Sequence, residues 1–197
     1  KIEKSIWIEV KDDWCLKDAM ELVQNLIQDK VFEFTQIGLK FLGRYADQMG
    51  QDELLVFEKW IEADLLDNWA AIDEIAPHVI GVLLENHPEL VKRVMEYTSS
   101  ENMWIRRTSA VSFILHARKG KYLDEVYHIA EDLFADRETD LIQKANGWVL
   151  REAGKTDMPR LEEFLLKHSR NIPRITLRYA IERFPEARRK ELLVLTK

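Results

Sequence analysis

Apolar residues recur at spacings of three and four along almost the whole chain, which is the period of an amphipathic α-helix. No stretch alternates apolar and polar residues over more than a few positions, so strands are not expected. The pattern therefore predicts an all-α protein. The predicted helices span residues 19–28, 35–48, 52–63, 69–76, 88–98, 104–118, 122–134, 140–154, 158–167 and 173–183.

Four of these helices begin at a regular interval. They start near Trp69, Trp104, Asp140 and Pro173, which are 35, 36 and 33 residues apart, and each has a partner helix beside it in the sequence. The joints are short, so sequential helices are expected to run antiparallel. A helix pair repeated at this period is typical of a HEAT or armadillo-like superhelical solenoid. We expect residues 1–197 to form a single domain of this kind, with its function on the concave inner surface.

The composition narrows the class of protein. The chain has 197 residues, of which 46% are hydrophobic and 32% charged, as in a compact globular protein. No apolar run reaches the roughly 20 residues that span a bilayer, and no charged-then-apolar leader opens the chain at Lys1. Cys15 is the only cysteine, which excludes an internal disulfide and makes a reducing compartment the default. We therefore expect a cytoplasmic protein that does not act at a membrane.

The net charge of −6 argues against nucleic acid as a partner, because duplex binding usually needs a cationic surface. The charge is unevenly distributed, however. Residues 1–103 hold 10 Lys and Arg against 21 Asp and Glu, a balance of −11, whereas residues 104–197 hold 19 against 14, a balance of +5. The second half of the chain is therefore suited to meet a polyanion.

Familiar catalytic motifs are absent from the sequence. Five histidines are present, but no two have the spacing that places metal ligands on one helical face. There is no glycine-rich phosphate loop and no Gly-x-Ser-x-Gly elbow. We therefore expect structural or solvated histidines, no bound metal and no cofactor.

The predicted helix 140–154 carries a stripe of cations around one aromatic ring. Lys144, Trp148, Arg151 and Lys155 fall at i, i+4, i+7 and i+11, which places them on one face. A separate stripe supplies core contacts: Ile142, Ala145, Val149 and Ala153. The cationic stripe is either a solvated face with a half-buried tryptophan or a surface that binds a ligand.

Two further arrangements have both a plain and a functional interpretation. Arg170, Arg174 and Arg178 recur every four residues, and three cations one turn apart repel each other unless an anion such as phosphate lies across them. Trp69 and Asp73 lie one turn apart behind a helix cap predicted at Asp67 and Asn68, so that a carboxylate stands beside an indole. The plain alternatives are solvated arginines, and a core tryptophan with an exposed aspartate.

Three segments are most informative when they are taken together: NWAAID at 68–73, WIRRT at 104–108 and IQKANGWVLRE at 142–152. In this order they resemble the DNA alkylation repair family, the HEAT-like-repeat alkylpurine DNA glycosylases. The resemblance covers roughly residues 30–185, and the third segment is its most distinctive part. Residue 70 is Ala, where members of the family often carry Asp.

The resemblance implies a set of functional residues. Trp69, Asp73, Arg107 and Trp148 would form the catalytic site on a concave DNA-binding surface. A further set of cations would contact the DNA backbone: Arg106, Lys144, Arg151, Lys155, Arg174 and Arg178. The implied partner is duplex DNA that contains alkylated purines, bound by a monomer without an obligate protein partner.

The resemblance also implies a glycosylase mechanism without base flipping. A 3-methyladenine or 7-methylguanine base carries a positive charge, so it leaves without a general acid. Asp73 would then stabilise the oxocarbenium-like sugar and orient a water molecule. Two alternatives keep the fold: a non-catalytic paralogue that binds distorted or branched DNA, and a helical-repeat scaffold for protein interactions.

Overall fold

The computed structural model describes residues 2–136 and 138–196. Within these residues every regular element is helical, so the predicted all-α class is confirmed. The residues group into two compact units, Lys1–Arg93 and Val94–Lys197, and each is described by itself. The assignment of residues 1–197 to a single domain stays a prediction. No helix in the described ranges is long and apolar enough to cross a membrane.

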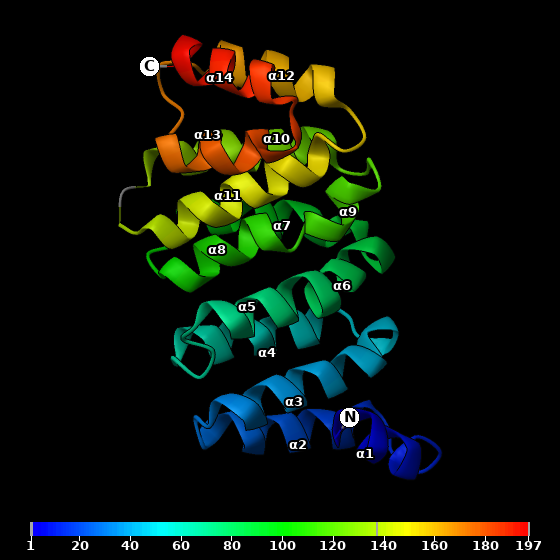
Figure 1. Ribbon diagram of the computed structural model, residues 1–197. Helices are drawn as coiled ribbons and strands as arrows, with labels where there is room; N and C mark the ends of the chain where they lie inside the picture. The colour runs from blue at the N-terminus through cyan, green and yellow to red at the C-terminus, as the bar shows by residue number, and fades with distance from the viewer. Residues whose placement is uncertain (1, 137, 197) are drawn as a thin grey trace. The chain divides into compact units, whose positions relative to one another are not determined.

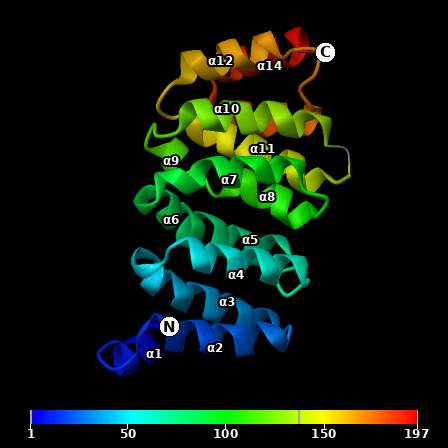
Figure 2. The same ribbon diagram turned by 180° about the vertical axis from the view of Figure 1, so that it is seen from behind.

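The first unit consists of helices that follow one another closely: α1 (Ile2–Val10), α2 (Leu16–Gln28), α3 (Phe32–Leu42), η1 (Gly43–Gln48), α4 (Gln51–Glu62), α5 (Trp69–Ile75), η2 (Ala76–Ile80), α6 (Gly81–Asn86), η3 (Pro88–Leu90) and the start of α7 (Val91–Glu96). They form two layers, with α3 and α5 in one and α2 and α4 in the other (Figures 1 and 2). Phe41, Phe57 and Ile72 belong to its core, and each is at most 1% exposed. Burial of such side chains is the main contribution to the stability of the stack.

The second unit also consists of consecutive helices: η4 (Tyr97–Ser99), α8 (Met103–Val111), α9 (Ile114–Arg118), α10 (Leu123–Asp132), η5 (Leu133–Ala135), α11 (Asp140–Ala153), α12 (Met158–Lys167), α13 (Arg174–Ala180), η6 (Ile181–Arg183) and α14 (Glu186–Leu195). Its central element is α11, which packs against α8, α9, α10 and α13. Figure 1 shows α11 between α8 and α13. The core stripe predicted for this helix is confirmed, because its four residues are at most 1% exposed: Ile142, Ala145, Val149 and Ala153.

Side-chain caps set the starts of three repeated helices. Asn68, Asn102 and Thr139 precede α5, α8 and α11, and each side-chain oxygen accepts a backbone N–H of the helix that follows, at 3.0, 2.8 and 3.2 Å. Such caps satisfy N–H groups that the first helical turn leaves without partners. The helices therefore begin at Trp69, Met103 and Asp140, which agrees with the predicted repeat.

Other predicted boundaries are corrected by the structure. The helix predicted at 69–76 continues through the π-helical η2 and into α6, because the wider turn accommodates Pro77, which has no N–H to donate. The helix predicted at 104–118 is interrupted after Val111 and resumes at Ile114. The sequence pattern did not predict α1 and α14. Among the described residues of these two helices, none of α1 and only Leu192 of α14 is buried, so neither helix has a strong apolar stripe.

Candidate nucleic-acid interface

Polar residues of the 142–152 segment hold α11 in place inside the second unit. The amide nitrogen of Gln143 donates to two carbonyl oxygens that precede α11, both at 2.8 Å, and its amide oxygen accepts from Thr176 on α13 at 2.5 Å. The amide nitrogen of Asn146 donates to a carbonyl oxygen of α10 at 2.9 Å. Both side chains are buried. They therefore serve the packing of α11 and are not offered to a ligand.

Gly147 marks the closest approach of α11 to α13. A Cβ atom at this position would lie 2.7 Å from the carbonyl oxygen of Thr176 and would also collide with the Cβ of Tyr179. Only glycine allows the two helix backbones to pack at this distance. The glycine of the 142–152 segment is thus explained by packing.

Glu152 is a buried carboxylate that anchors two cations. Its side chain is 2% exposed and accepts from Arg118 Nε at 2.7 Å and from Lys155 Nζ at 2.6 Å. Burial by itself raises the pKa of Glu152, but the hydrogen bonds from Lys155 and Arg118 outweigh it and hold the pKa below its ordinary value. Lys155, predicted to contact DNA, is therefore engaged inside the fold.

The remaining members of the cationic stripe face outward from α11. Lys144 and Trp148 are half-buried, and Lys144 forms no ion pair with any residue of the described ranges. Arg151 is also half-buried, and its guanidinium donates to the carboxylate of Glu182. Nε of Arg151 also lies 3.7 Å from the buried carboxylate of Glu152. The stripe thus presents one indole and one cation without an acidic partner, together with a second cation that is paired with one exposed and one buried acid.

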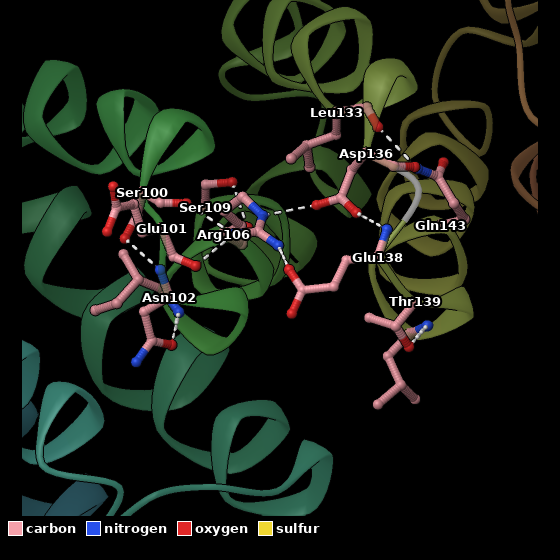
Figure 3. Close-up of polar contacts among 12 residues, drawn as sticks. Ser100, Glu101, Asn102, Arg106, Ser109, Leu133, Asp136, Glu138, Thr139 and Gln143 are labelled. Carbon is pink, nitrogen blue, oxygen red and sulfur yellow. Dashed lines mark hydrogen bonds and ion pairs between the residues drawn. The ribbon is translucent and has the colours of Figure 1, made fainter.

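Arg106 is enclosed by oxygen atoms of its own unit (Figure 3). Its Nε donates to Asp136 at 2.6 Å, its Nη2 donates to Glu138, and its Nη1 donates to the carbonyls of Ser100 and Glu101 at 2.7 and 2.9 Å. Only 12% of its side chain is exposed. The two acids that hold Arg106 lie 30 and 32 residues further along the chain, so its pairing arises only in the folded protein. Its contact with DNA stays a prediction.

Arg107 reaches the beginning of α11. It is 5% exposed, and its Nη1 donates to the carbonyl oxygen of Leu141 in the first turn of that helix. Arg107 therefore lies at the junction of α8 and α11.

The cations predicted on α13 are exposed. Arg178 forms no ion pair with a described residue, whereas Nη1 of Arg174 donates to the carbonyl oxygen of Thr196 at 3.1 Å. Tyr179 beside them is 37% exposed. α13 packs on α11, the helix that carries Lys144 and Trp148.

The first unit holds the predicted aromatic and acidic pair on α5. Trp69 is 56% exposed and Asp73, one turn later, is half-buried, whereas the opposite face of α5 is buried. Sequence reasoning did not weigh the neighbouring carboxylate, Glu74. Its burial raises its pKa, an effect that nearby His78 and Lys40 reduce. No signal in the sequence distinguishes Glu74 from Asp73 except the i, i+4 relation of Asp73 to Trp69.

The predicted site residues therefore fall into two groups. Trp69 and Asp73 lie in the first unit, and the others, from Arg106 to Arg178, lie in the second. Within the second unit Arg107 reaches the first turn of α11, and α13, which carries Arg174 and Arg178, packs on α11. Among the described residues no group of three or more His, Cys, Asp or Glu is placed to hold a metal ion.

These observations define a helical-repeat protein that presents aromatic and cationic side chains from successive repeats. A family model described as DNA alkylation repair enzyme matches residues 1–184. The chain belongs to this family. The family model matches from residue 1, whereas the resemblance seen in the sequence begins near residue 30. The first residues were not recognised because the three segments that carry the resemblance all lie beyond residue 67.

A solved structure described as a predicted DNA alkylation repair enzyme from Enterococcus faecalis has a similar fold. The TM-score is 0.77 and the sequence identity 17%, and the similarity covers 93% of this chain and 85% of that one. At this level of identity the likeness concerns the fold alone. No curated protein matches the chain in sequence.

Proposed function

We propose that this protein is a DNA glycosylase that removes 3-methyladenine and 7-methylguanine from duplex DNA without flipping the base. The observation that carries the proposal is the pair on α5, where the indole of Trp69 is 56% exposed and the carboxylate of Asp73 follows one turn later. An indole face and an anion are the two groups that suit a sugar whose charge becomes positive. Membership of a DNA alkylation repair family supplies the substrate class.

The reaction follows from the charge of the lesion. An N3-alkylated adenine or N7-alkylated guanine is a cation, so when the bond to C1′ breaks the base takes the electron pair and leaves as a neutral molecule. The deoxyribose then acquires oxocarbenium character. Asp73 stabilises this charge and orients a water molecule, whose oxygen forms the new bond to C1′ as its proton is lost.

The aromatic side chains hold the sugar during this step. Trp69 and Trp148 pack their indole faces on the deoxyribose, and by analogy with cation–π pairs each contributes about 0.5 to 2 kcal/mol to stabilising the developing cation. Because the enzyme contacts sugar and backbone, the base needs no deep pocket.

The phosphates are held by the cations of the second unit. Lys144 and Arg178 have no acidic partner among the described residues. Arg107, which reaches the first turn of α11, is proposed to act with them. Arg151 and Arg174 join them by exchanging a protein oxygen for a phosphate oxygen. Such contacts fix the register of the protein on DNA without reading its sequence. We place the protein as a monomer on the DNA of the cytoplasm or nucleoid.

The proposal is tested by incubating the protein with methylated duplex DNA in the presence of a metal chelator and separating the freed bases chromatographically. We expect release of 3-methyladenine or 7-methylguanine, with apurinic sites left in the duplex in equal number. Retention of both bases on the DNA, despite measurable binding of the duplex, would instead identify a non-catalytic DNA-binding protein.

A further inference from the structure

A network of polar side chains joins α8 to the segment that leads into α11 (Figure 3). Its centre is the ion pair of Arg106 and Asp136, whose side chains are 12% and 7% exposed. One carboxylate oxygen of Asp136 accepts from Arg106 Nε at 2.6 Å, and the other accepts the N–H of Glu138 at 3.0 Å. The carbonyl of Asp136 accepts from Gln143 at 2.8 Å. Asp136 thus connects α8, the joining segment and α11.

The same network fixes the first turn of α11. Thr139 caps the helix, and Arg107, next to Arg106 in the sequence, donates to the carbonyl of Leu141. Gln143, which holds Asp136, completes this turn. Two successive residues of α8 therefore hold the region where α11 begins: Arg106 binds Asp136 and Glu138, and Arg107 binds Leu141 in the first turn of α11.

The beginning of α11 determines where its outward-facing residues lie. Lys144 and Trp148 follow Gln143 by one and five residues on an unbroken helix. A helix behaves as a rigid rod over this length, so a shift of its first turn moves both side chains. A displacement of about 1 Å is enough to reduce the rate of a reaction up to roughly a hundredfold when it misplaces groups at the reacting centre.

We infer that Arg106 is a positioning residue: by holding Asp136 and Glu138 it sets the start of α11 and thereby places Trp148 and Lys144, and it does not contact DNA. The inference rests on the proposed function for what α11 contacts. It explains why a cation in a DNA repair protein is paired with two acids. Four N–H donations of Arg106 already go to protein oxygens, which leaves little of its charge for a phosphate.

The test compares Arg106→Gln and Asp136→Asn with the control Arg160→Gln. Arg160 also joins two helices of this unit through a carboxylate, that of Asp124, but it lies on α12. The control reports the general effect of losing an arginine–carboxylate pair. Asp136→Asn is the milder variant and carries the test if Arg106→Gln does not fold.

Three measurements are made on the full chain. Hydrogen exchange at the amides of Leu141 and Lys144 should be at least about tenfold faster in both network variants, and unchanged in the control. The slope of duplex affinity against salt should be the same in Arg106→Gln as in Asp136→Asn, because both variants act through the position of Lys144, and it should equal that of the wild type in the control. The single-turnover rate of base release at saturating protein should fall by roughly ten- to a hundredfold in the network variants only.

Several results would overturn the inference. A salt slope that falls by about 0.9 in Arg106→Gln but not in Asp136→Asn means that Arg106 itself neutralises a phosphate. Tighter binding of DNA by Asp136→Asn means that Asp136 competes with DNA for the guanidinium. Unchanged hydrogen exchange at the start of α11 means that the network does not hold it. If the wild type releases no base, the proposed glycosylase function is contradicted. The hydrogen-exchange measurement still tests whether Arg106 positions the start of α11.

Discussion

Glu152 shows how a single buried charge is made compatible with the core. The carboxylate is 2% exposed, whereas its partners Arg118 and Lys155 are 48% and 34% exposed. An acid buried alone would favour its neutral form, but two charge-assisted hydrogen bonds keep it ionised. The cations remain partly hydrated, so only one member of the group bears a large desolvation cost.

The lowered pKa of Glu152 predicts a dependence of stability on pH. Because the pKa is lower in the folded than in the unfolded protein, the ion pairs stabilise the fold above the unfolded-state pKa, near 4.5. This contribution is lost as the pH falls through the folded pKa. Glu152→Gln should therefore unfold with about 2 kcal/mol less free energy than the wild type at pH 7. Urea unfolding at pH 7 and at pH 3 checks this, and an equal difference at both values contradicts it.

At the scale of elements, the contact of α11 with α13 depends on Gly147. Gly147→Ala forces a methyl group against Thr176 and Tyr179, and the helices must separate to admit it. We expect a loss of roughly 1–3 kcal/mol in the free energy of unfolding, as for other overpacked sites. The matched control is Gly43→Ala, where the backbone is helical and nothing lies within 4 Å of the added atom.

The control should behave in the opposite sense. Alanine restricts the unfolded chain more than glycine does, so Gly43→Ala should be neutral or stabilising by up to about 1 kcal/mol. Denaturant unfolding of both variants separates the two cases. Equal stability of Gly147→Ala and the wild type would show that α13 does not press on α11 at this point.

The elements themselves were largely predictable from the sequence, because helical periodicity and caps are local properties. The spacing of apolar residues identified α11 and its buried stripe, and Asn68 correctly indicated the start of α5. The π-helical turn at Pro77 was not predictable, since a proline usually ends or bends a helix. The terminal helices α1 and α14 were not predicted, because they bury too few apolar side chains to give a clear helical periodicity in the sequence.

The roles of individual cations were less predictable than the helices that carry them. Periodicity correctly placed Lys144 and Trp148 on the outward-facing side of α11. The family resemblance assigned Arg106 and Lys155 to DNA, although both are paired with carboxylates. The acids that hold Arg106 come from a different repeat, and their proximity arises only from folding. Spacing along one helix therefore cannot separate a structural arginine from one that is available to a phosphate.

At the scale of the whole molecule, a negative net charge of −6 coexists with a cationic second half. Counterion release makes DNA binding depend on the cations at the contact, not on the net charge. Lys144→Gln and Arg178→Gln should each reduce the slope of log affinity against log salt by about 0.9. Titrations of a labelled duplex at several salt concentrations measure the slope, with Lys155→Gln as the comparison that leaves it unchanged. A slope altered by Lys155→Gln alone would reverse this assignment.

The central claim is that the carboxylate of Asp73 acts on the sugar of an alkylated nucleotide. It is tested most directly by the single-turnover rate of base release at saturating protein, measured for the wild type, Asp73→Asn and Glu74→Gln. Asp73→Asn removes the anion with little change in size, and Glu74→Gln does the same one residue away on α5. We predict a fall of at least about a hundredfold for Asp73→Asn with duplex affinity retained, and a rate near that of the wild type for Glu74→Gln. A wild-type rate in Asp73→Asn, or an equal loss in both variants, contradicts the proposed role of Asp73.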